Sequence, residues 1–251
     1  MPGKKSIAIV LAAGQGKRMG TATAKQFLLL GDKPVLYYAL KAFEDSAVDG
    51  IVLVTAADEI EYCRQEIVEK YQFRKVIAIT QGGQERYHSV YQGIQKIKEL
   101  SEEQSFAPEL VFVHDGARPF VTVEMIGQLM EETRKCQACV SATPVKDTIK
   151  IADEDGFCET TPKRKLVWAV QTPQVFTYDV IVMAYSRLIR QEDELLRMGM
   201  QITDDAMVVE TMLQKKVRLV EGSYRNIKLT TPEDLLVAKA FLDDFEKIEK
   251  N

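Results

Sequence analysis

The sequence predicts an α/β fold with a doubly wound, mostly parallel β-sheet that carries helices on both faces. Three observations favour this fold class. Short β-branched apolar runs recur along the chain, helical patterns of apolar residues separate them, and a glycine-rich segment directly follows the first run. With 251 residues, of which 46% are apolar, the chain is long enough for one large domain, so we expect a single domain over residues 1–251.

The expected strands are apolar runs bounded by turn formers, as is typical of strands buried on both faces of a parallel sheet. They lie at residues 7–11, 51–55, 76–80, 110–114 and 139–143. Between them, one helix is expected to begin near Pro34 and another after Arg86. The residues expected to face the core are Leu36, Leu40 and Phe43 in the first helix and Val90, Ile94 and Ile97 in the second.

The pattern changes between residues 145 and 175, where polar and β-branched residues alternate around a turn at 153–156 and a basic cluster at 163–165. This alternation predicts a β-hairpin that protrudes from the core as an arm over about residues 145–172. Because a protruding hairpin has unpaired strand edges, we expect it to embrace a partner subunit, with a solvent-exposed flap as the alternative.

After the arm, the sequence predicts helices near residues 178–190 and 204–213, a strand at 217–220 and a terminal helix. The terminal helix has a clear start signal, with Thr231 as the N-cap, Pro232 in the first turn and acidic residues directly behind it.

The segment from Leu11 to Gln26, LAAGQGKRMGTATAKQ, has the composition of a loop that wraps a polyphosphate. Its glycines allow consecutive backbone N–H groups to point at one anion, and Arg18 and Lys25 add positive charge. Spacing excludes both a P-loop and the dinucleotide-binding fingerprint, because Met19 stands where these motifs need a glycine or, in the fingerprint, an alanine. An ordinary strand-to-helix loop with solvated cations is the alternative.

Three further polar clusters follow expected strands, and the ligands of open parallel sheets bind outside the carboxyl ends of the strands. The cluster at residues 82–89 would hold a base or a sugar hydroxyl through backbone N–H groups and Ser89. In the next cluster Asp115 would face a metal-bound triphosphate, with helix capping or pairing with Arg118 as the alternative. In the last, Lys228 stands between apolar residues, which indicates a strand end that opens into a site.

The composition narrows the class of ligand. A net charge of −4 provides no general basic field, so we expect a small-molecule ligand and no nucleic acid. The first apolar run spans only about six residues, too short for a signal peptide or a membrane span. We therefore expect a cytoplasmic protein without membrane association.

The cysteines and histidines favour no metal site. Cys136 and Cys139 form a Cys-x-x-Cys pair, but no second pair follows, and the only histidines are His88 and His114. Buried or unreactive thiols are expected in place of metal or redox chemistry. His114 is expected to be structural, because no histidine or cysteine lies at a ligand spacing from it.

Together the motifs resemble one known family over about residues 7–242. In order they read LAAGQGKRMG, AKQFL, GGQERYHSV, VHDGARPF, PVKDTIK, WAVQTPQ, ITDD and NIKLTTPEDL. This set is similar to the 2-C-methyl-D-erythritol 4-phosphate cytidylyltransferases of the non-mevalonate isoprenoid pathway. The resemblance implies a Rossmann-like nucleotidyltransferase fold, Mg²⁺ as cofactor, and a homodimer in which the arm of one subunit completes the site of the other. It also implies transfer of CMP from CTP to 2-C-methyl-D-erythritol 4-phosphate, which forms 4-diphosphocytidyl-2-C-methyl-D-erythritol and releases pyrophosphate.

Matching motif positions carry the site residues of that family onto this chain. The implied catalytic residues are Arg18, Lys25 and Lys228, which would hold the triphosphate and the transition state. The implied acceptor-binding residues are Arg164 and Thr172, both from the arm of the partner subunit, and Thr203. The residues implied to bind CTP are Ala12, Ala13, Gly14, Gly16, Gly83, Gln84, Arg86, Ser89, Asp115 and Gly116, and Asp115 is also the possible metal contact. Three positions, Gln84, Gly116 and Asp205, depart from the aspartate, alanine and glutamate common in relatives, and none of these departures removes a charged catalytic group.

The implied acceptor is itself a phosphate monoester, whose oxygen is a competent nucleophile near neutral pH, so no general base is needed. Catalysis would then consist of positioning and of electrostatic stabilisation at the α-phosphate. A ribitol 5-phosphate cytidylyltransferase, with a different acceptor chosen by the arm region, is one alternative, and a non-catalytic nucleotide sensor is another. The sensor is disfavoured because Arg18, Lys25, Asp115 and Lys228 are all present.

Overall fold

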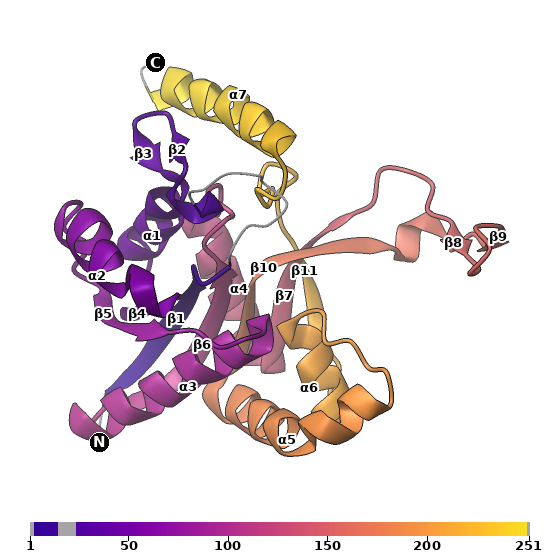
Figure 1. Ribbon diagram of the computed structural model, residues 1–251, viewed down its shortest axis with the longest axis horizontal. Helices are drawn as coiled ribbons and strands as arrows, with labels where there is room; N and C mark the ends of the chain where they lie inside the picture. The colour runs from indigo at the N-terminus through magenta and orange to yellow at the C-terminus, as the bar shows by residue number, and fades with distance from the viewer. Residues whose placement is uncertain (1–2, 15–23, 250–251) are drawn as a thin grey trace.

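The fold is built on one seven-stranded sheet with the strand order β11-β7-β10-β6-β1-β4-β5 (Figure 1). The computed structural model describes residues 3–14 and 24–249. The strands are β1 (Lys4–Leu11), β4 (Gly50–Thr55), β5 (Val76–Gln81), β6 (Ala107–Asp115), β7 (Ala138–Pro144), β10 (Trp168–Thr177) and β11 (Arg218–Glu221). All neighbours in the sheet are parallel except β10, which runs antiparallel to both β6 and β7. The predicted mostly parallel sheet is thus confirmed.

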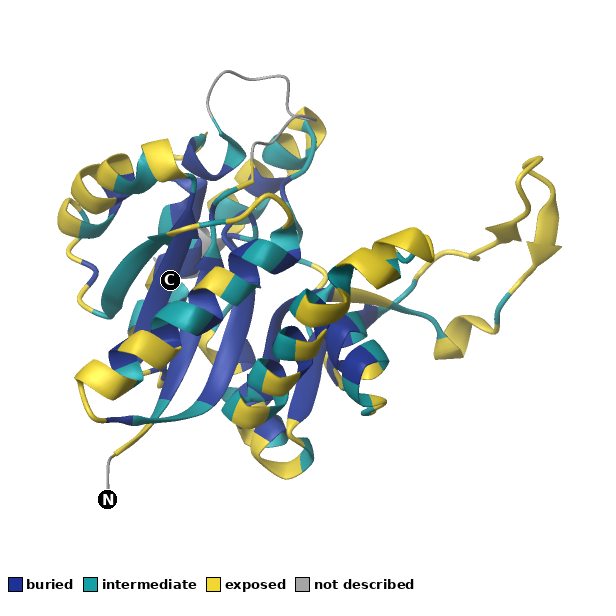
Figure 2. Ribbon diagram, turned by 60° about the horizontal axis from the view of Figure 1, so that its bottom comes forward, coloured by how far each residue is buried: buried dark blue, intermediate teal, exposed yellow. Residues whose placement is uncertain are grey.

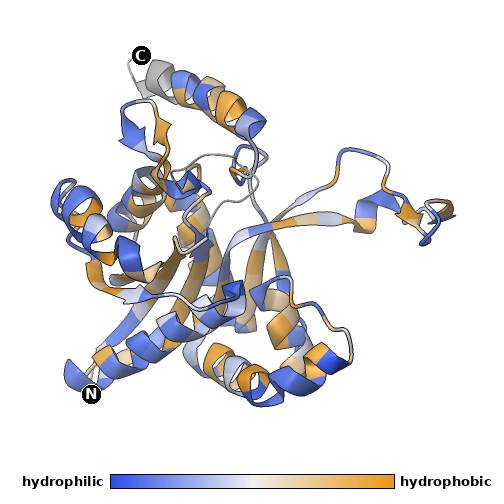
Figure 3. Ribbon diagram, viewed as in Figure 1, coloured by the Kyte–Doolittle hydropathy of each residue, from blue (hydrophilic) through white to orange (hydrophobic). Residues whose placement is uncertain are grey.

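Helices cover both faces of this sheet. One face packs against α1 (Val35–Asp45), α4 (Val123–Cys136) and the π-helical segment η4 (Cys63–Glu69), which continues the short α2 (Ile60–Tyr62). The other face packs against α3 (Arg86–Glu103), α5 (Tyr178–Arg197) and α6 (Asp205–Leu213). Figure 3 shows apolar colour along the central strands and alternating colour along the helices, as two-faced burial requires.

The expected apolar stripes form the core. Leu36, Leu40 and Phe43 of α1 are fully buried, as are Val90 and Ile97 of α3. A stripe of this kind faces inward because residues three and four apart share one side of a helix. The predicted doubly wound arrangement is confirmed in both layers.

The segment at 145–175 differs in part from the predicted hairpin. An antiparallel pair, β8 (Ile151–Ala152) and β9 (Cys158–Thr160), does protrude from the body and is exposed throughout, with the 3-10 turn η5 (Arg164–Leu166) at its return (Figure 2). The return strand β10, however, runs on into the centre of the main sheet between β6 and β7. Its inner half is buried because it lies between two strands and under α5, so the protruding part ends before Gln171.

The last helix, α7 (Pro232–Glu249), packs against a small hairpin of β2 (Leu29–Leu30) and β3 (Lys33–Pro34) that follows the 3-10 turn η2 (Lys25–Phe27). The helix begins directly after Thr231, as predicted, and the Asp234 carboxylate accepts the backbone N–H groups of Thr230 and Thr231. Just before it, Leu229 is fully buried and its N–H donates to the Ala117 carbonyl. These contacts place the Lys228 segment against the end of β6. A second 3-10 turn, η3 (Ala57–Glu59), links β4 to α2.

Within the residues that the structure describes, none of the helices has the length and apolar content that crossing a membrane would require.

Candidate functional site

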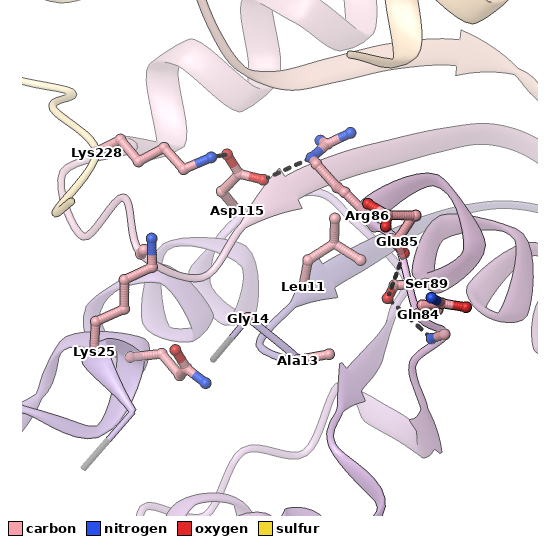
Figure 4. A pocket seen from close by; sticks show the side chains of 13 residues that line it. Leu11, Ala13, Gly14, Lys25, Gln84, Glu85, Arg86, Ser89, Asp115 and Lys228 are labelled. Atoms are coloured by element: carbon pink, nitrogen blue, oxygen red, sulfur yellow. Dashed lines mark hydrogen bonds and ion pairs between the residues drawn. The ribbon is translucent and has the colours of Figure 1, made fainter. Parts of the chain in front are cut away.

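A cleft of about 690 Å³ opens at the carboxyl ends of β1, β5 and β6 (Figure 4). Its walls come from the end of β1, from η2, from the start of α3, from the end of β6 and from the segment before α7. The residues that line it are Leu11, Ala13, Gly14, Lys25, Gln26, Gly83, Gln84, Glu85, Arg86, Ser89, Asp115, Ala117 and Lys228. This volume is within the range of small-molecule sites, and the position is the one expected for a ligand of an open α/β sheet.

Asp115, the last residue of β6, lies between two cations. Its Oδ1 is 3.2 Å from Nε of Arg86, and its Oδ2 is 2.7 Å from Nζ of Lys228. Burial raises the pKa of the Asp115 carboxyl, but Arg86 and Lys228 outweigh burial and hold this pKa well below its ordinary value. Asp115 is therefore a permanently charged aspartate that positions two cations and cannot act as a proton donor.

Arg86 is in turn fixed by Asp205, the first residue of α6. Two parallel hydrogen bonds of 2.9 and 2.8 Å join Nη1 and Nη2 of Arg86 to the two carboxylate oxygens of Asp205. Asp205 is fully buried, and the Tyr185 hydroxyl donates a third hydrogen bond to it at 2.5 Å. This paired geometry fixes the plane of the guanidinium group, so only small shifts of Arg86 relative to Asp115 are possible.

A second network, made of hydrogen bonds between uncharged groups, holds the backbone of Asp115. Its N–H donates to Oγ1 of Thr172, whose hydroxyl donates to Nδ1 of His114, and Nε2 of His114 donates to the Arg118 carbonyl. Complete burial lowers the pKa of His114 to about 4. The ring is neutral at neutral pH with both nitrogens hydrogen-bonded, which confirms that His114 is structural.

The segment that carries Lys228 is fixed on β10 by Asn226. The Asn226 amide is fully buried and donates to the Thr172 carbonyl at 2.9 Å and to Oε1 of Gln171 at 3.3 Å. The Arg118 guanidinium donates to the Asn226 carbonyl from the other side. Lys228 therefore enters the cleft from a rigid support, although it belongs to a loop.

Most of the residues implied by the sequence meet in this cleft. Lys25, Lys228, Ala13, Gly14, Gly83, Gln84, Arg86, Ser89 and Asp115 all line it. Ala12 and Gly116 lie directly beneath: Ala12 is 2% exposed, and Gly116 donates its N–H to the Leu11 carbonyl. A Cβ at position 116 would stand 2.9 Å from that carbonyl oxygen and 2.8 Å from Cδ1 of Leu36, so a larger residue here would require Leu36 or the backbone to shift. Gly16 and Arg18 lie outside the described residues.

The acceptor-binding residues implied for the arm need one correction. Thr172 lies in the buried half of β10, 4% exposed, and its hydroxyl is occupied by Asp115 and His114, so it cannot reach into a partner subunit. In the arm itself, the exposed Arg164 donates from Nη2 to Oγ1 of Thr148 at 2.9 Å. Thr148 is thus the arm hydroxyl beside Arg164. Thr203 is exposed before α6 and is not among the cleft-lining residues.

Asp205, Tyr185 and Asn226 support the cleft-lining residues through hydrogen bonds, and sequence analysis did not assign them this role. Asp205 follows Asp204, whose carboxylate accepts the Met207 N–H as the N-cap of α6. The capping role of the first aspartate can be read from the sequence, whereas the burial of the second, which requires a cation as partner, follows only from the structure.

The cysteines take no part in the cleft. All four are free, and burial raises the pKa of the thiol to about 11 for Cys63 and about 12 for Cys139. Across the described ranges no group of three or more His, Cys, Asp or Glu side chains is arranged to hold a metal ion.

Known proteins with similar sequences and structures share one description. The model of a family described as 2-C-methyl-D-erythritol 4-phosphate cytidylyltransferase matches residues 6–244. A relative of that name from Lachnospira eligens is 50% identical over 236 residues, 94% of this chain and 98% of that protein. Another from Lachnoclostridium phytofermentans is 46% identical over 243 residues, 97% of this chain and 98% of that protein. The crystal structure of a 4-diphosphocytidyl-2C-methyl-D-erythritol synthase from Anaerococcus prevotii superimposes with a TM-score of 0.78 at 33% identity, covering 96% of each chain.

The buried neutral His114 predicts a pH dependence of stability. Between pH 6.5 and about 4 the unfolded chain binds a proton at this residue and the folded chain does not, so stability falls as the pH falls. The contribution reaches about 3 kcal/mol at the acid end of this window. In urea unfolding at pH 7, 5.5 and 4.5, His114→Gln should lose this slope while starting from a lower stability at pH 7. Parallel pH profiles for both proteins would contradict the assignment.

Proposed function

The chain belongs to the 2-C-methyl-D-erythritol 4-phosphate cytidylyltransferase family, and we propose that the cleft at Asp115 performs its reaction with Lys25, Lys228 and Arg18 as the cations around the transferred phosphate. The enzyme transfers CMP from CTP to 2-C-methyl-D-erythritol 4-phosphate and releases pyrophosphate. The observation that carries the assignment of residues is the convergence of Lys228 and Arg86 on Asp115 in the cleft that Lys25 also lines.

The shape of the cleft suggests how CTP lies in it. Figure 4 shows Lys25, Lys228 and Asp115 toward one side and Gln84 and Ser89 toward the other. We place the triphosphate at the cationic side and the base and ribose beside the start of α3. The small residues Ala13 and Gly14 lie between the two and allow the nucleotide to approach the backbone.

The chemistry requires charge stabilisation and no proton transfer by the protein. An oxygen of the acceptor phosphate attacks the α-phosphorus of CTP, and the bond from that phosphorus to the pyrophosphate oxygen breaks. Lys25 and Lys228 offset the charge that develops on the α-phosphate oxygens and on the departing pyrophosphate. Asp115 and His114 suit this scheme, because the first stays ionised and the second stays neutral.

The donors of the cleft fit a magnesium ion that arrives with the nucleotide. Mg²⁺ is commonly bound through one or two carboxylates together with substrate phosphates, and it neutralises phosphate charge. Asp115 is the carboxylate placed for this role, because the Glu85 carboxylate caps α3. Both oxygens of Asp115 are already paired with cations, so a metal contact would compete with Lys228 for Oδ2.

We further propose that the protein is a homodimer whose arm completes the partner's cleft. The arm extends away from the body of its own subunit (Figure 1) and exposes large apolar side chains, with Phe157 73% and Leu166 70% exposed. Apolar side chains at the end of a protruding hairpin are typical of a surface that packs on another protein. Arg164, beside Thr148, is the cation that the arm would bring to the acceptor phosphate.

Replacing Lys25 tests its place in the reaction. Lys25→Ala should lower kcat about 100-fold to 1,000-fold, the usual cost of one cation aimed at the transition state, with the fold retained. The assay measures pyrophosphate release with CTP, Mg²⁺ and 2-C-methyl-D-erythritol 4-phosphate, and ribitol 5-phosphate serves as a comparison acceptor. Lys70→Ala, which removes an exposed lysine paired with Glu66, is the control and should match the wild type. A Lys25→Ala enzyme with nearly normal kcat would remove Lys25 from the mechanism.

Replacing Arg164 tests its assignment to the acceptor phosphate. Arg164→Ala should raise the KM for the acceptor far more than the KM for CTP, because Arg164 is assigned to the acceptor phosphate.

Mixing the Arg164→Ala and Lys25→Ala variants tests whether the arm acts on the partner subunit. A heterodimer of Arg164→Ala and Lys25→Ala subunits has one cleft with both residues intact if the arm crosses over. At an acceptor concentration well below the KM of the Arg164→Ala enzyme, an equal mixture should then show about a quarter of wild-type activity, since half the dimers are mixed and each has one intact site. An arm that serves its own subunit would give no gain on mixing.

A further inference from the structure

A chain of hydrogen bonds leads from the nucleotide side of the cleft to the outer helix α5. The backbone N–H of Glu85, the N-cap of α3, donates to Nδ1 of His88 at 3.2 Å. On the other side of the ring, Nε2 of His88 is 2.8 Å from Oε1 of Glu192 in α5. The Tyr87 hydroxyl donates to this same oxygen at 2.7 Å.

The contacts fix the proton on the His88 ring. Because Nδ1 accepts the Glu85 N–H, the ring proton lies on Nε2, where Glu192 accepts it. The hydrogen bonds from Tyr87 and His88 outweigh partial burial and hold the pKa of Glu192 below its ordinary value. Glu192 is thus an ionised acceptor that holds the orientation of the imidazole.

The loop that lines the nucleotide side rests directly on His88. A Cβ at Gly83 would lie within 2.3 Å of the His88 Cβ, so the backbone of Gly83 is in close contact with that side chain. The Gly83 N–H donates to Oγ of Ser89 at 3.1 Å, which binds the loop to the next residue of α3 as well. The Gly83 contact is to the His88 Cβ, which stays in place when the ring turns, whereas the Glu85 N–H is bonded to the ring itself. A rotation of the His88 ring would therefore release the backbone of Glu85, which lines the cleft beside Gly83 and Gln84.

We propose that Glu192 is a positioning residue for CTP: through His88 it holds the loop from Gly82 to Glu85 in the conformation that receives the nucleotide. Glu192 does not line the cleft and lies 105 residues after Tyr87 in the chain. The proposal rests on the proposed function, because it takes this loop as part of the CTP site. It assigns to the outer helix a role in nucleotide affinity and none in the chemical step.

Three variants separate this role from simple support of α3. Glu192→Ala removes the acceptor of both His88 and Tyr87, and loss of the His88 hydrogen bond should raise the KM for CTP about threefold to tenfold, with kcat and the KM for the acceptor phosphate unchanged. Glu192→Gln should restore a KM within about twofold of wild type, since one carbonyl oxygen can replace the single oxygen that both contacts use. His88→Gln keeps a side chain that can cap the Glu85 N–H but loses the hydrogen bond from the imidazole to Glu192, while Tyr87 still donates to Glu192, so its KM for CTP should resemble that of Glu192→Ala.

Two comparisons complete the experiment. The double variant His88→Gln with Glu192→Ala should be no worse than either single variant, because both break the same link. Glu194→Ala, which changes an exposed glutamate on the same helix, is the matched control and should match the wild type.

An unchanged KM for CTP in Glu192→Ala, or a Glu192→Gln enzyme that fails as the alanine variant does, would overturn the proposal. A uniform loss of kcat and of thermal stability in all variants would overturn it too, since it would indicate a structural contact only. Wild-type protein that releases no pyrophosphate would instead refute the proposed function.

Discussion

The site depends on an alternating row of four charges, Asp205, Arg86, Asp115 and Lys228, arranged so that each charge has an opposite neighbour. Asp205 is fully buried and the side chain of Asp115 is only 10% exposed, so either carboxylate without its cation would be strongly destabilising. The row joins α6, α3, β6 and the segment before α7. The cleft therefore forms only when these four elements come together and their charges are paired.

This arrangement explains why the cations are in place before a substrate arrives. Arg86 is fixed by the two hydrogen bonds that it donates to a carboxylate at a helix start, and the Asp115 backbone is held by Thr172 of the antiparallel strand β10. Donors that are already oriented need no reorganisation when charge develops on a phosphate. The antiparallel strand thus supports the cleft, since its Thr172 accepts the Asp115 N–H and the Thr172 carbonyl accepts a hydrogen bond from Asn226 of the Lys228 segment.

The fold was predictable where local pattern decides structure. Five apolar runs correctly predicted five strands of the sheet, because a strand buried on both faces is apolar along its whole length. Helical periodicity identified the inward faces of α1 and α3, because a helix buried on one side has apolar residues three and four positions apart. The rule that ligands bind at the carboxyl ends of parallel strands predicted that Lys25, Asp115 and Lys228 lie near one another, and all three line the same cleft. Local pattern could not show that β10 enters the centre of the sheet, because its alternation from Trp168 onward is equally typical of an exposed hairpin.

Long-range pairing accounts for the rest. Asp205 lies 119 residues from Arg86, and nothing in the sequence near either residue indicates the other. Thr172 was assigned to the arm by its motif, but its neighbours in space, His114 and Asp115, belong to a strand more than fifty positions earlier. Residue spacing indicates which groups carry chemistry, whereas the partners that fix them follow from the fold.

A double-mutant cycle in urea unfolding tests most directly whether the four charges act as one unit. Asp205→Asn and Lys228→Met change opposite ends of the row, and any coupling between them passes through the Arg86–Asp115 pair. The account predicts that their effects on the free energy of unfolding differ from additivity by about 1 kcal/mol or more, whereas Asp205→Asn with Lys70→Met is additive. Additive effects for Asp205→Asn and Lys228→Met would show that the two ends are independent and would contradict the account.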